Sequence, residues 1–297
     1  MQTSAAFTPN YATELTHQAA AQVGLAHASI KLVRMGTTAV LRLPNGVIAR
    51  VARDASWLQT AEREVRVAAA LERAGVPCTV PYRVDQPVLV DGHPITFWAE
   101  IPGPLYEPTP AEFGAVLRLL HRVDRGDDLG LSQLDPWGRT PERIEQAPLG
   151  NRERGVLRDV LAELQEAWAG VRFVLGRGVI HGDAHLGNFV RGADGTTVLL
   201  DFDSVCLGPR DWDLIPTALY ATSLGWLDRA DYRSFVEAYG FDITTSPAFP
   251  VLARMRELRM TVWLAMHATE SERVAAQVAH RIACLVDPEL PRHWSSR

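Results

Sequence analysis

A dense polar run between two apolar segments constrains this chain more than any other feature of its sequence. The run, VIHGDAHLGNFV at residues 179–190, holds His181, Asp183, His185 and Asn188. A second apolar segment, TVLLDFDSV, follows it and carries Asp201 and Asp203. A buried polar group costs free energy unless it is paired or bound to something. These side chains therefore either satisfy one another or bind a ligand.

The residue types in this region suit phosphoryl transfer. Asp183 can accept a proton from a substrate hydroxyl, whereas Asn188 and Asp201 can offer an amide oxygen and a carboxylate to one metal ion. Magnesium favours a few oxygen ligands together with substrate phosphates. Phosphoryl transfer requires a base near the nucleophile and metal ions that bridge the phosphates. We therefore expect the three residues to converge where a terminal phosphate meets an alcohol.

Taken together, HGDAHLGN and LLDFD resemble motifs of the phosphotransferase family that includes aminoglycoside and choline kinases. The family pattern is H-G-D-x-x-x-x-N, a short β insert, and then a D-x-D or D-F-G-like element. The resemblance implies an α+β, protein-kinase-like bilobal fold that uses ATP and Mg2+. In that fold a small antiparallel-sheet lobe with one main helix precedes a larger, mostly helical lobe. By the same resemblance Asp183 is the catalytic base, Asn188 and Asp201 hold the metal, and His181 braces the loop.

Hydrophobic periodicity and turn residues predict the elements of both lobes. Residues 9–23 read as a helix capped by Thr8, residues 28–53 as three strands, and residues 86–103 as two more. Helices are predicted within residues 60–77, 109–124, 151–171, 211–226, 228–240 and 248–270. We expect a nucleotide-binding lobe over residues 1–99. A second lobe over residues 100–297 would carry the catalytic loop, the metal site and the acceptor pocket.

The order of segments in the first lobe agrees with the family. The turn expected to cover the phosphates holds Gly36, Thr37 and Thr38, although taken alone it also fits a plain hairpin. The segment TFWAEIPG resembles the hinge between lobes. Adenine is expected at the Ala99 carbonyl and the Ile101 amide. Trp98 is expected to line the back of the purine pocket, or to fill the core as a large aromatic side chain.

One position departs from the family pattern. Arg50 stands where the resemblance calls for the phosphate-binding lysine, and Lys31 is the chain's one lysine. Glu64 matches the family's partner glutamate, and Glu62 is expected to face solvent. Arginine makes planar, bidentate contacts where lysine is a point charge. Arg50 is thus expected to pair with Glu64 and contact phosphate in a different geometry, with an ordinary strand arginine as the alternative.

Further polar residues are candidates for bracing the loop or contacting the acceptor. They are His185, Asp203, Asp211, Asp213, Trp263, His267 and Glu270. Asp213 is expected to hold the loop, His121 to be a packed imidazole, and Arg256 with Glu257 to form a solvated or structural helix face. Since several candidates are carboxylates that can bind an ammonium group, the expected acceptor is polar or cationic. By the family resemblance alone, an aminosugar, an aminoglycoside-like antibiotic or a related amino alcohol is the leading class.

Two other functions compete with this interpretation. HGDAH offers His181, Asp183 and His185 as ligands of a metal-dependent hydrolase, but zinc sites need further well-placed ligands, and Asn188 and Asp201 then go unexplained. A catalytically silent nucleotide-binding protein on the kinase scaffold is the second, and Arg50 is the residue that favours it.

Composition narrows the class of protein. Of the 297 residues, 47% are hydrophobic and 22% are charged, as in an ordinary globular chain. The net charge of −5 argues against a nucleic-acid binder. No apolar run is long enough for a membrane span, and residues 1–18 lack the features of a secretory signal. The 3 widely spaced cysteines fit reduced thiols, so a cytoplasmic protein is expected.

Overall fold

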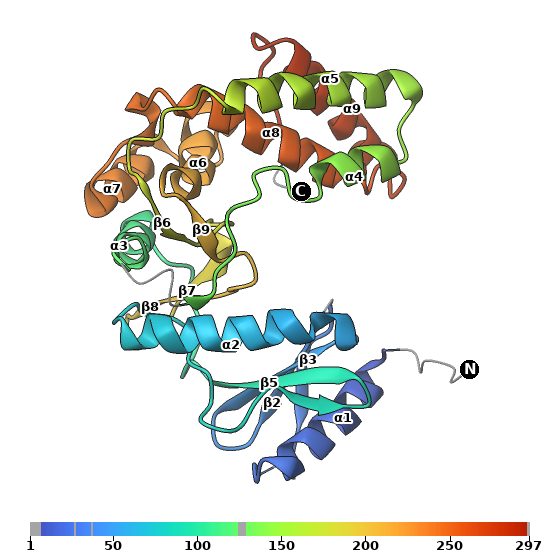
Figure 1. Cartoon of the computed structure of the whole chain (residues 1–297), viewed down its shortest axis with the longest axis vertical. Helices are drawn as coiled ribbons and strands as arrows, with labels where there is room; N and C mark the ends of the chain where they lie inside the picture. The colour runs from blue at the N-terminus through green and yellow to red at the C-terminus, as the bar shows by residue number, and fades with distance from the viewer. Residues whose placement is uncertain (1–6, 27, 37, 124–128, 296–297) are drawn as a thin grey trace. The chain divides into compact units, whose positions relative to one another are not determined.

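The computed structural model describes residues 7–26, 28–36, 38–123 and 129–295, and the chain packs into two compact units (Figure 1). The first unit comprises Met1–Pro108, Arg125–Gly130 and Leu186–Val205. The second comprises Thr109–Asp124, Leu131–His185 and Cys206–Arg297. The boundary expected between residues 99 and 100 stays a prediction about folding domains. In the structure, residues 186–205 pack with the first unit although they follow that boundary in the chain.

An antiparallel five-stranded sheet of order β1-β2-β3-β5-β4 forms the centre of the first unit. Its strands are β1 (Lys31–Arg34), β2 (Thr38–Leu43), β3 (Val47–Ala52), β4 (Val88–Val90) and β5 (His93–Ala99). Alternate residues of β2, β3 and β5 form a buried apolar face, which packs against helix α1 (Pro9–Gln22). The alternation follows from the two-residue period of a strand. The opposite face of the sheet is therefore free for polar residues.

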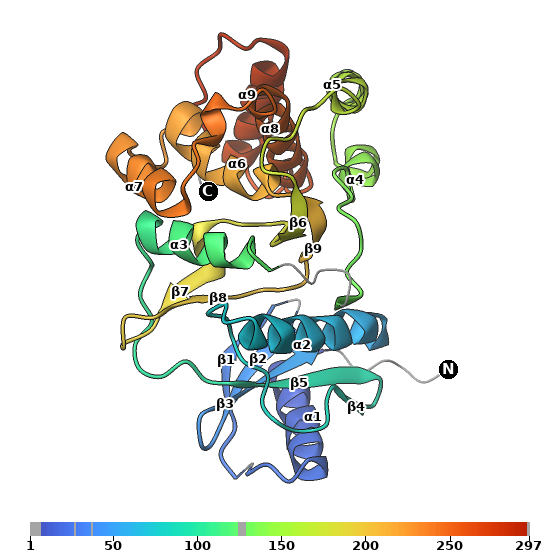
Figure 2. The same cartoon turned by 60° about the vertical axis from the view of Figure 1, so that its left-hand side comes forward.

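Helix α2 (Leu58–Arg73) follows the short η1 (Ala55–Trp57) and lies on the other side of the sheet from α1 (Figures 1 and 2). A hairpin of β7 (Phe189–Arg191) and β8 (Thr197–Leu199) belongs to the same unit. It is joined to the unit by a bridge between Cys78 and Leu199 and another between Tyr106 and Arg191. The segment after the polar run is thereby joined to the first unit.

Helices and one short ladder make up the second unit. The helices are α3 (Pro110–Leu120), α4 (Thr140–Gln146), α5 (Asn151–Trp168), α6 (Asp211–Leu219), α7 (Arg229–Tyr239), α8 (Phe249–Ala265) and α9 (Glu272–Val286). Strands β6 (Arg177–Ile180) and β9 (Cys206–Pro209) pair antiparallel. Helices α3 and α7 pack closely, since the rings of Phe113 and Phe235 lie 5.2 Å apart and Gly114 faces the Phe235 carbonyl. The ladder ends at the catalytic-loop motif.

The predicted fold class is confirmed. Strands β1 to β5 lie within the predicted segments, and α1 begins with Thr8 as cap, its hydroxyl accepting from the Tyr11 amide at 3.3 Å. Thr109 and Glu112 form a capping box at α3. The segment 211–226 differs from a single predicted helix, because α6 gives way to a π-helical turn, Tyr220–Leu224. Helices α4 and α9 were not predicted, although Ser271 caps α9 with its hydroxyl.

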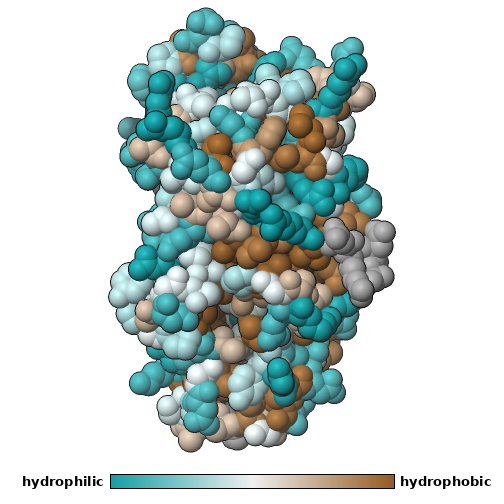
Figure 3. Space-filling view, turned by 90° about the vertical axis from the view of Figure 1, so that its left-hand side faces the viewer, coloured by the Kyte–Doolittle hydropathy of each residue, from teal (hydrophilic) through white to brown (hydrophobic). Residues whose placement is uncertain are grey.

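Figure 3 shows a face that is mostly polar, with apolar side chains in patches among hydrophilic ones. Within the described residues, no helix combines the length and the apolar character needed to cross a membrane.

Candidate active site

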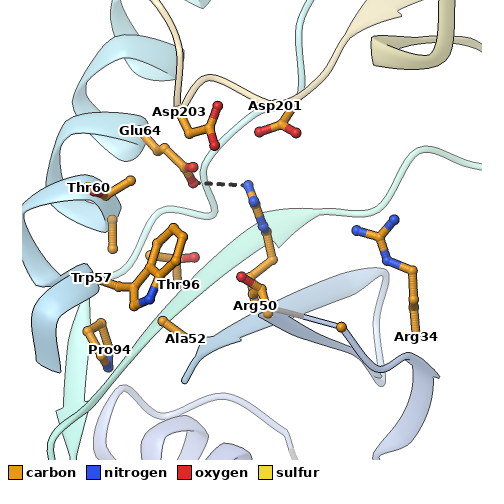
Figure 4. Close-up of a pocket in the computed structure, with 13 residues that line it drawn as sticks. Arg34, Arg50, Ala52, Trp57, Thr60, Glu64, Pro94, Thr96, Asp201 and Asp203 are labelled. Carbon is orange, nitrogen blue, oxygen red and sulfur yellow. Dashed lines mark hydrogen bonds and ion pairs between the residues drawn. The ribbon is translucent and has the colours of Figure 1, made fainter. Parts of the chain in front are cut away.

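A cavity of about 320 Å³ opens on the polar face of the sheet in the first unit (Figure 4). Its walls are formed by Arg34, Gly36, Thr38, Arg50, Ala52, Trp57, Thr60, Ala61, Glu64, Pro94, Thr96, Asp201 and Asp203. Strand register explains the shared face, because Thr38 lies opposite Ala52 and Arg50 lies opposite Thr96. Polar residues of β2, β3, β5 and α2 thus meet the two carboxylates that follow β8.

Arg50 and Glu64 form the expected ion pair across this cavity. The Arg50 Nη1 atom lies 3.0 Å from Glu64 Oε2, and Glu64 is buried. Burial raises the pKa of Glu64, Arg50 opposes that rise, and Asp203 and Asp201 add to it. Glu62 is exposed, as predicted. The arginine therefore neutralises a buried carboxylate at the position where the family pattern has lysine.

The expected phosphate-covering turn and hinge lie at opposite ends of these strands. Gly36 and Thr38 line the cavity, and Thr37 lies outside the described residues. Trp98 is 3% exposed, and its indole donates to Thr96 Oγ1 at 2.9 Å. Its ring stacks on Phe202, with centroids 6.1 Å apart. Trp98 is thus a core aromatic residue, and its place at the back of a purine pocket stays a prediction. Contacts of adenine with Ala99 and Ile101, which are half-buried, stay a prediction.

Asn188 and Asp201 lie at the same end of the β7–β8 hairpin. Phe189 pairs with Leu199, and the Leu200 amide donates to the Asn188 carbonyl at 2.9 Å. Asp201 is exposed and adopts φ +59°, a left-handed conformation that is unusual for a residue other than glycine. The register thus brings the two predicted metal ligands to neighbouring positions of one hairpin.

The donor set at this hairpin fits a hard cation. It consists of the Asn188 amide and the Asp201 carboxylate, with Asp203 exposed nearby in the chain. Within the described ranges, no three His, Cys, Asp or Glu side chains gather in a way that could hold a metal ion. Magnesium often binds with one or two protein oxygens plus phosphate oxygens and water, whereas structural zinc needs four protein ligands. The residues present therefore fit Mg2+ bound together with a phosphorylated substrate.

In the second unit, Asp213 holds the backbone of the catalytic-loop motif. Its Oδ2 accepts from the His181 amide at 2.6 Å and from His121 Nε2 at 3.0 Å, and its Oδ1 accepts from the Gly182 amide at 2.9 Å. The Tyr239 hydroxyl lies 2.7 Å from the other nitrogen of His121. The three side chains of this network, those of Asp213, His121 and Tyr239, are buried. His121 is thus a packed, hydrogen-bonded imidazole, and Asp213 a loop brace, as expected.

Asp183 projects from this braced loop with 42% of its side chain exposed. Arg256 Nη1 lies 3.0 Å from its Oδ1, and His185 Nε2 lies 3.6 Å from its Oδ2. Burial raises the pKa of Asp183, but the hydrogen bond from His185 and the charge of Arg256 outweigh it, and the pKa falls well below the usual range. His181 is fully buried, and the Asp183 amide lies 3.4 Å from its Nδ1. The carboxylate is therefore accessible and ionised.

Arg256 is the site residue that sequence reasoning missed. Of the expected alternatives, a solvated or a structural helix face, the solvated one is wrong for both residues. Glu257 is structural, buried at 3.1 Å from Arg292 Nε, whereas Arg256 contacts Asp183. The available signal was a pair of arginines, Arg256 and Arg259, spaced about one turn apart in a helix that also carries Arg254 and Glu257.

The other acceptor candidates lie apart from Asp183. Asp211 is fully buried and accepts from the Val174 and Leu175 amides at 3.0 Å each, so it braces a different loop. His267 Nδ1 lies 2.7 Å from Glu270 Oε1, and the Trp263 ring lies 5.0 Å from that of His267. His267 and Glu270 line a separate cavity between the end of α8 and α9. An acceptor role for them stays a prediction.

A family model described as "Phosphotransferase enzyme family" matches residues 31–258, most of the chain. The chain belongs to this family. None of the curated proteins matches it. As a member of the phosphotransferase family, the protein is an enzyme that transfers a phosphoryl group to a hydroxyl.

Solved structures of several small-molecule kinases are similar in fold to this phosphotransferase. The amicoumacin kinase hAmiN, in complex with AMP-PNP, Ca2+ and Ami, superimposes with a TM-score of 0.71 at 14% identity over 95% of each chain. Spectinomycin phosphotransferase APH(9)-Ia gives 0.62 at 13% identity, covering 89% of this chain and 90% of the other. Choline kinase LicA from Streptococcus pneumoniae gives 0.62 at 14% identity, covering 91% and 98%. At sequence identities of 13–14%, these structural similarities show that the chain has the kinase-like fold.

Proposed function

We propose that this phosphotransferase is a small-molecule kinase, which transfers the γ-phosphoryl group of ATP to a hydroxyl of a polar acceptor with Mg2+ as cofactor. The observation that carries the proposal is the ionised Asp183 on a braced loop. An accessible carboxylate there can accept a hydrogen bond from the hydroxyl of an acceptor alcohol. The Asn188 and Asp201 oxygens, placed at one end of a hairpin, supply the complementary metal-binding step.

Asn188 and Asp201 would hold Mg2+, which when bound neutralises charge on the phosphates. Arg50, half-buried beside Glu64, would contact the phosphates as a planar, bidentate donor. Gly36 and Thr38 would let the backbone approach the same phosphates closely. These residues bind and orient the nucleotide, and positioning of this kind accounts for most of the catalysis in phosphoryl transfer.

Asp183 would accept a hydrogen bond from the acceptor hydroxyl and hold that oxygen in line with the phosphoryl group. Its pKa lies well below the usual range, so the carboxylate is a weak base. A weak base is adequate here, because the loose transition state of phosphoryl transfer does not need the proton removed early. The proton would pass to an Asp183 oxygen as the new P–O bond to the acceptor forms and the bond between the γ-phosphorus and the bridging oxygen breaks, which releases ADP.

The acceptor class proposed from the family resemblance is an aminosugar, an aminoglycoside-like antibiotic or a related amino alcohol. The titles of similar structures name amicoumacin, spectinomycin and choline kinases, which supports a hydroxyl-bearing small molecule of this general kind. Of the carboxylates considered for an ammonium group, Asp211 is committed to the backbone amides of another loop.

The test is a transfer assay with Mg–ATP over amino sugars, aminoglycosides, choline-like alcohols and neutral sugars, followed by mapping of the phosphorylated product. We expect Mg–ATP to raise the thermal stability and at least one acceptor to be phosphorylated. Asp183→Asn should abolish transfer, while Asp194→Asn, at an exposed turn of the β7–β8 hairpin, should not. Nucleotide binding without transfer over the whole panel would instead identify a silent scaffold.

A further inference from the structure

We propose that Arg34 is a second phosphate-binding arginine, which together with Arg50 holds the phosphate chain of the nucleotide at two points. This inference rests on the kinase function proposed above and adds a residue to its nucleotide site. Arg34 ends strand β1 and stands two positions before Gly36 of the expected phosphate-covering turn.

An irregularity in the pairing of β1 directs Arg34 toward the cavity. Leu32 pairs with Leu41. Arg34 pairs with Val40, although a regular antiparallel ladder would place it opposite Ala39. Ala39 belongs to the buried apolar face of the sheet, which packs against α1. Because a shift of one residue moves a side chain to the other face of a sheet, the β-bulge places Arg34 on the polar face.

Arg34 and Arg50 therefore share one row of the sheet. Val40 pairs with both of them, with Arg34 on one side and Arg50 on the other. Both arginines line the cavity of about 320 Å³, and Figure 4 shows their guanidinium groups on the side where Asp201 and Asp203 lie. Two strand spacings, about 10 Å, separate their backbones. The two guanidinium groups are thus placed to meet different phosphates of one chain.

The two arginines differ in how firmly they are held. Arg50 Nη1 lies 3.0 Å from Glu64 Oε2, and the Arg50 guanidinium lies 5.8 Å from the centre of the Trp98 ring. Arg34 is exposed, and among the residues that the structure describes it has no hydrogen-bond or ion-pair partner. Arg34 can therefore turn toward phosphate oxygens that Arg50, tied to Glu64, does not reach.

The charges around the cavity make this role depend on the metal ion. Two guanidinium groups and three carboxylates line it, those of Arg34, Arg50, Glu64, Asp201 and Asp203. With Arg63 of α2, which donates to the Asp203 carbonyl, positive and negative charges balance. The charges of the protein alone therefore do not attract an anion. Mg2+ held at Asp201 would add two positive charges, so Arg34 should strengthen the binding of phosphates in the presence of magnesium.

Two other roles of Arg34 predict different measurements. If Arg34 is only a charged residue that protects the edge of the sheet, its loss leaves nucleotide binding unchanged. If its charge instead competes with the metal ion for Asp201, its loss strengthens magnesium-dependent binding. A phosphate contact predicts the opposite sign, a weaker binding that is confined to ligands with a phosphate chain.

The experiment measures the affinities of adenosine, AMP-PNP and inorganic triphosphate by isothermal titration, with and without magnesium. The variants are Arg34→Gln, Arg34→Lys and, as matched control, Lys31→Gln. Lys31 lies on the same strand and is exposed like Arg34, but it does not line the cavity. The control therefore removes one positive charge from β1 without removing a group from the proposed site.

We expect Arg34→Gln to raise the Kd of Mg–AMP-PNP about 10- to 100-fold, the loss expected for hydrogen bonds to a charged group. The Kd of adenosine should not change, and Arg34→Lys should restore part of the affinity because a cation remains. Lys31→Gln should bind all three ligands as the unmodified chain does.

Four results would overturn the inference: unchanged or tighter binding of Mg–AMP-PNP by Arg34→Gln, an equal loss of adenosine affinity, an equal loss in Lys31→Gln, or no binding of either phosphate ligand by the unmodified chain. Absence of transfer to every acceptor would instead refute the kinase function, and the titrations would still decide the role of Arg34.

Discussion

Replacing Asp213 with asparagine should disable the catalytic loop without unfolding the protein. The two carboxylate oxygens of Asp213 accept from three buried donors, the His181 amide at 2.6 Å, the Gly182 amide at 2.9 Å and His121 Nε2 at 3.0 Å. An asparagine has one acceptor oxygen, so its NH2 group must face at least one of these donors. A buried unsatisfied donor costs about 1–3 kcal/mol, and the remaining bonds lose their charge assistance.

The free energy of unfolding should therefore fall by about 2–4 kcal/mol, a loss that a typical domain stability of about 5–15 kcal/mol tolerates. Urea unfolding followed by tryptophan fluorescence would show the midpoint about 1 M lower. Since a displacement of about 1 Å can cost about 100-fold in rate, kcat at low temperature should fall by that order. The matched control is Asp211→Asn on the same helix, whose carboxylate accepts from the Val174 and Leu175 amides of another loop.

The control should lose similar stability and keep its kcat. An equal fall of kcat in both variants would show that general destabilisation, and not the brace on the catalytic loop, governs the rate. Full activity of Asp213→Asn would likewise refute the role given to this carboxylate.

Three further predictions follow from the contacts described. Arg50→Gln should raise the KM for ATP by about 10- to 100-fold, and Arg50→Lys should raise it by less because a cation remains. If steady-state kinetics gave equal KM values for the unmodified protein and both variants, Arg50 would not contact phosphate. Gly114→Ala would place a Cβ 2.7 Å from the Phe235 carbonyl, so the free energy of unfolding, measured in urea, should fall by about 1–3 kcal/mol. At Gly155 the space is open, so Gly155→Ala should raise the free energy of unfolding by up to about 1 kcal/mol. Arg256→Gln should raise the pKa of Asp183, because the positive charge that lowers it is removed. The ionised carboxylate is the active form, so activity is lost as the pH falls through that pKa. The acid limb of the kcat/KM profile should therefore move to higher pH. A pH profile with an unmoved acid limb would contradict the last prediction.

Local motifs made much of the site predictable. The polar run at residues 179–190 is contiguous, so its motif can be recognised without knowledge of the fold. The family resemblance predicted that Arg50 and Glu64 pair, because the family's order indicates which strand and which helix carry them. The hairpin that brings Asn188 beside Leu200 follows from two short apolar segments separated by a glycine-rich turn.

The rotation of α6 and α8 about their own axes determines which of their polar side chains face the catalytic loop, and the sequence does not specify that rotation. Asp211 and Asp213 lie two positions apart on α6, which directs them about 200° apart around the helix. Which one faces the catalytic loop depends on how α6 packs, so sequence alone left Asp211 open as an acceptor contact. The contact of Arg256 with Asp183 joins residues 73 positions apart. It depends on the rotation of α8, whose apolar residues are spread around the helix and indicate no single buried face.

The most direct test of the central claim separates binding from transfer in two variants. Isothermal titration would measure Mg–ATP affinity, and single-turnover assays with the best acceptor of the panel would measure γ-phosphoryl transfer. The account predicts that Asp183→Asn binds Mg–ATP as the unmodified chain does and transfers about 10²- to 10⁴-fold more slowly. It predicts that Asp201→Asn loses the magnesium-dependent part of nucleotide binding. Undiminished transfer by Asp183→Asn, or magnesium-dependent binding unchanged in Asp201→Asn, would contradict it.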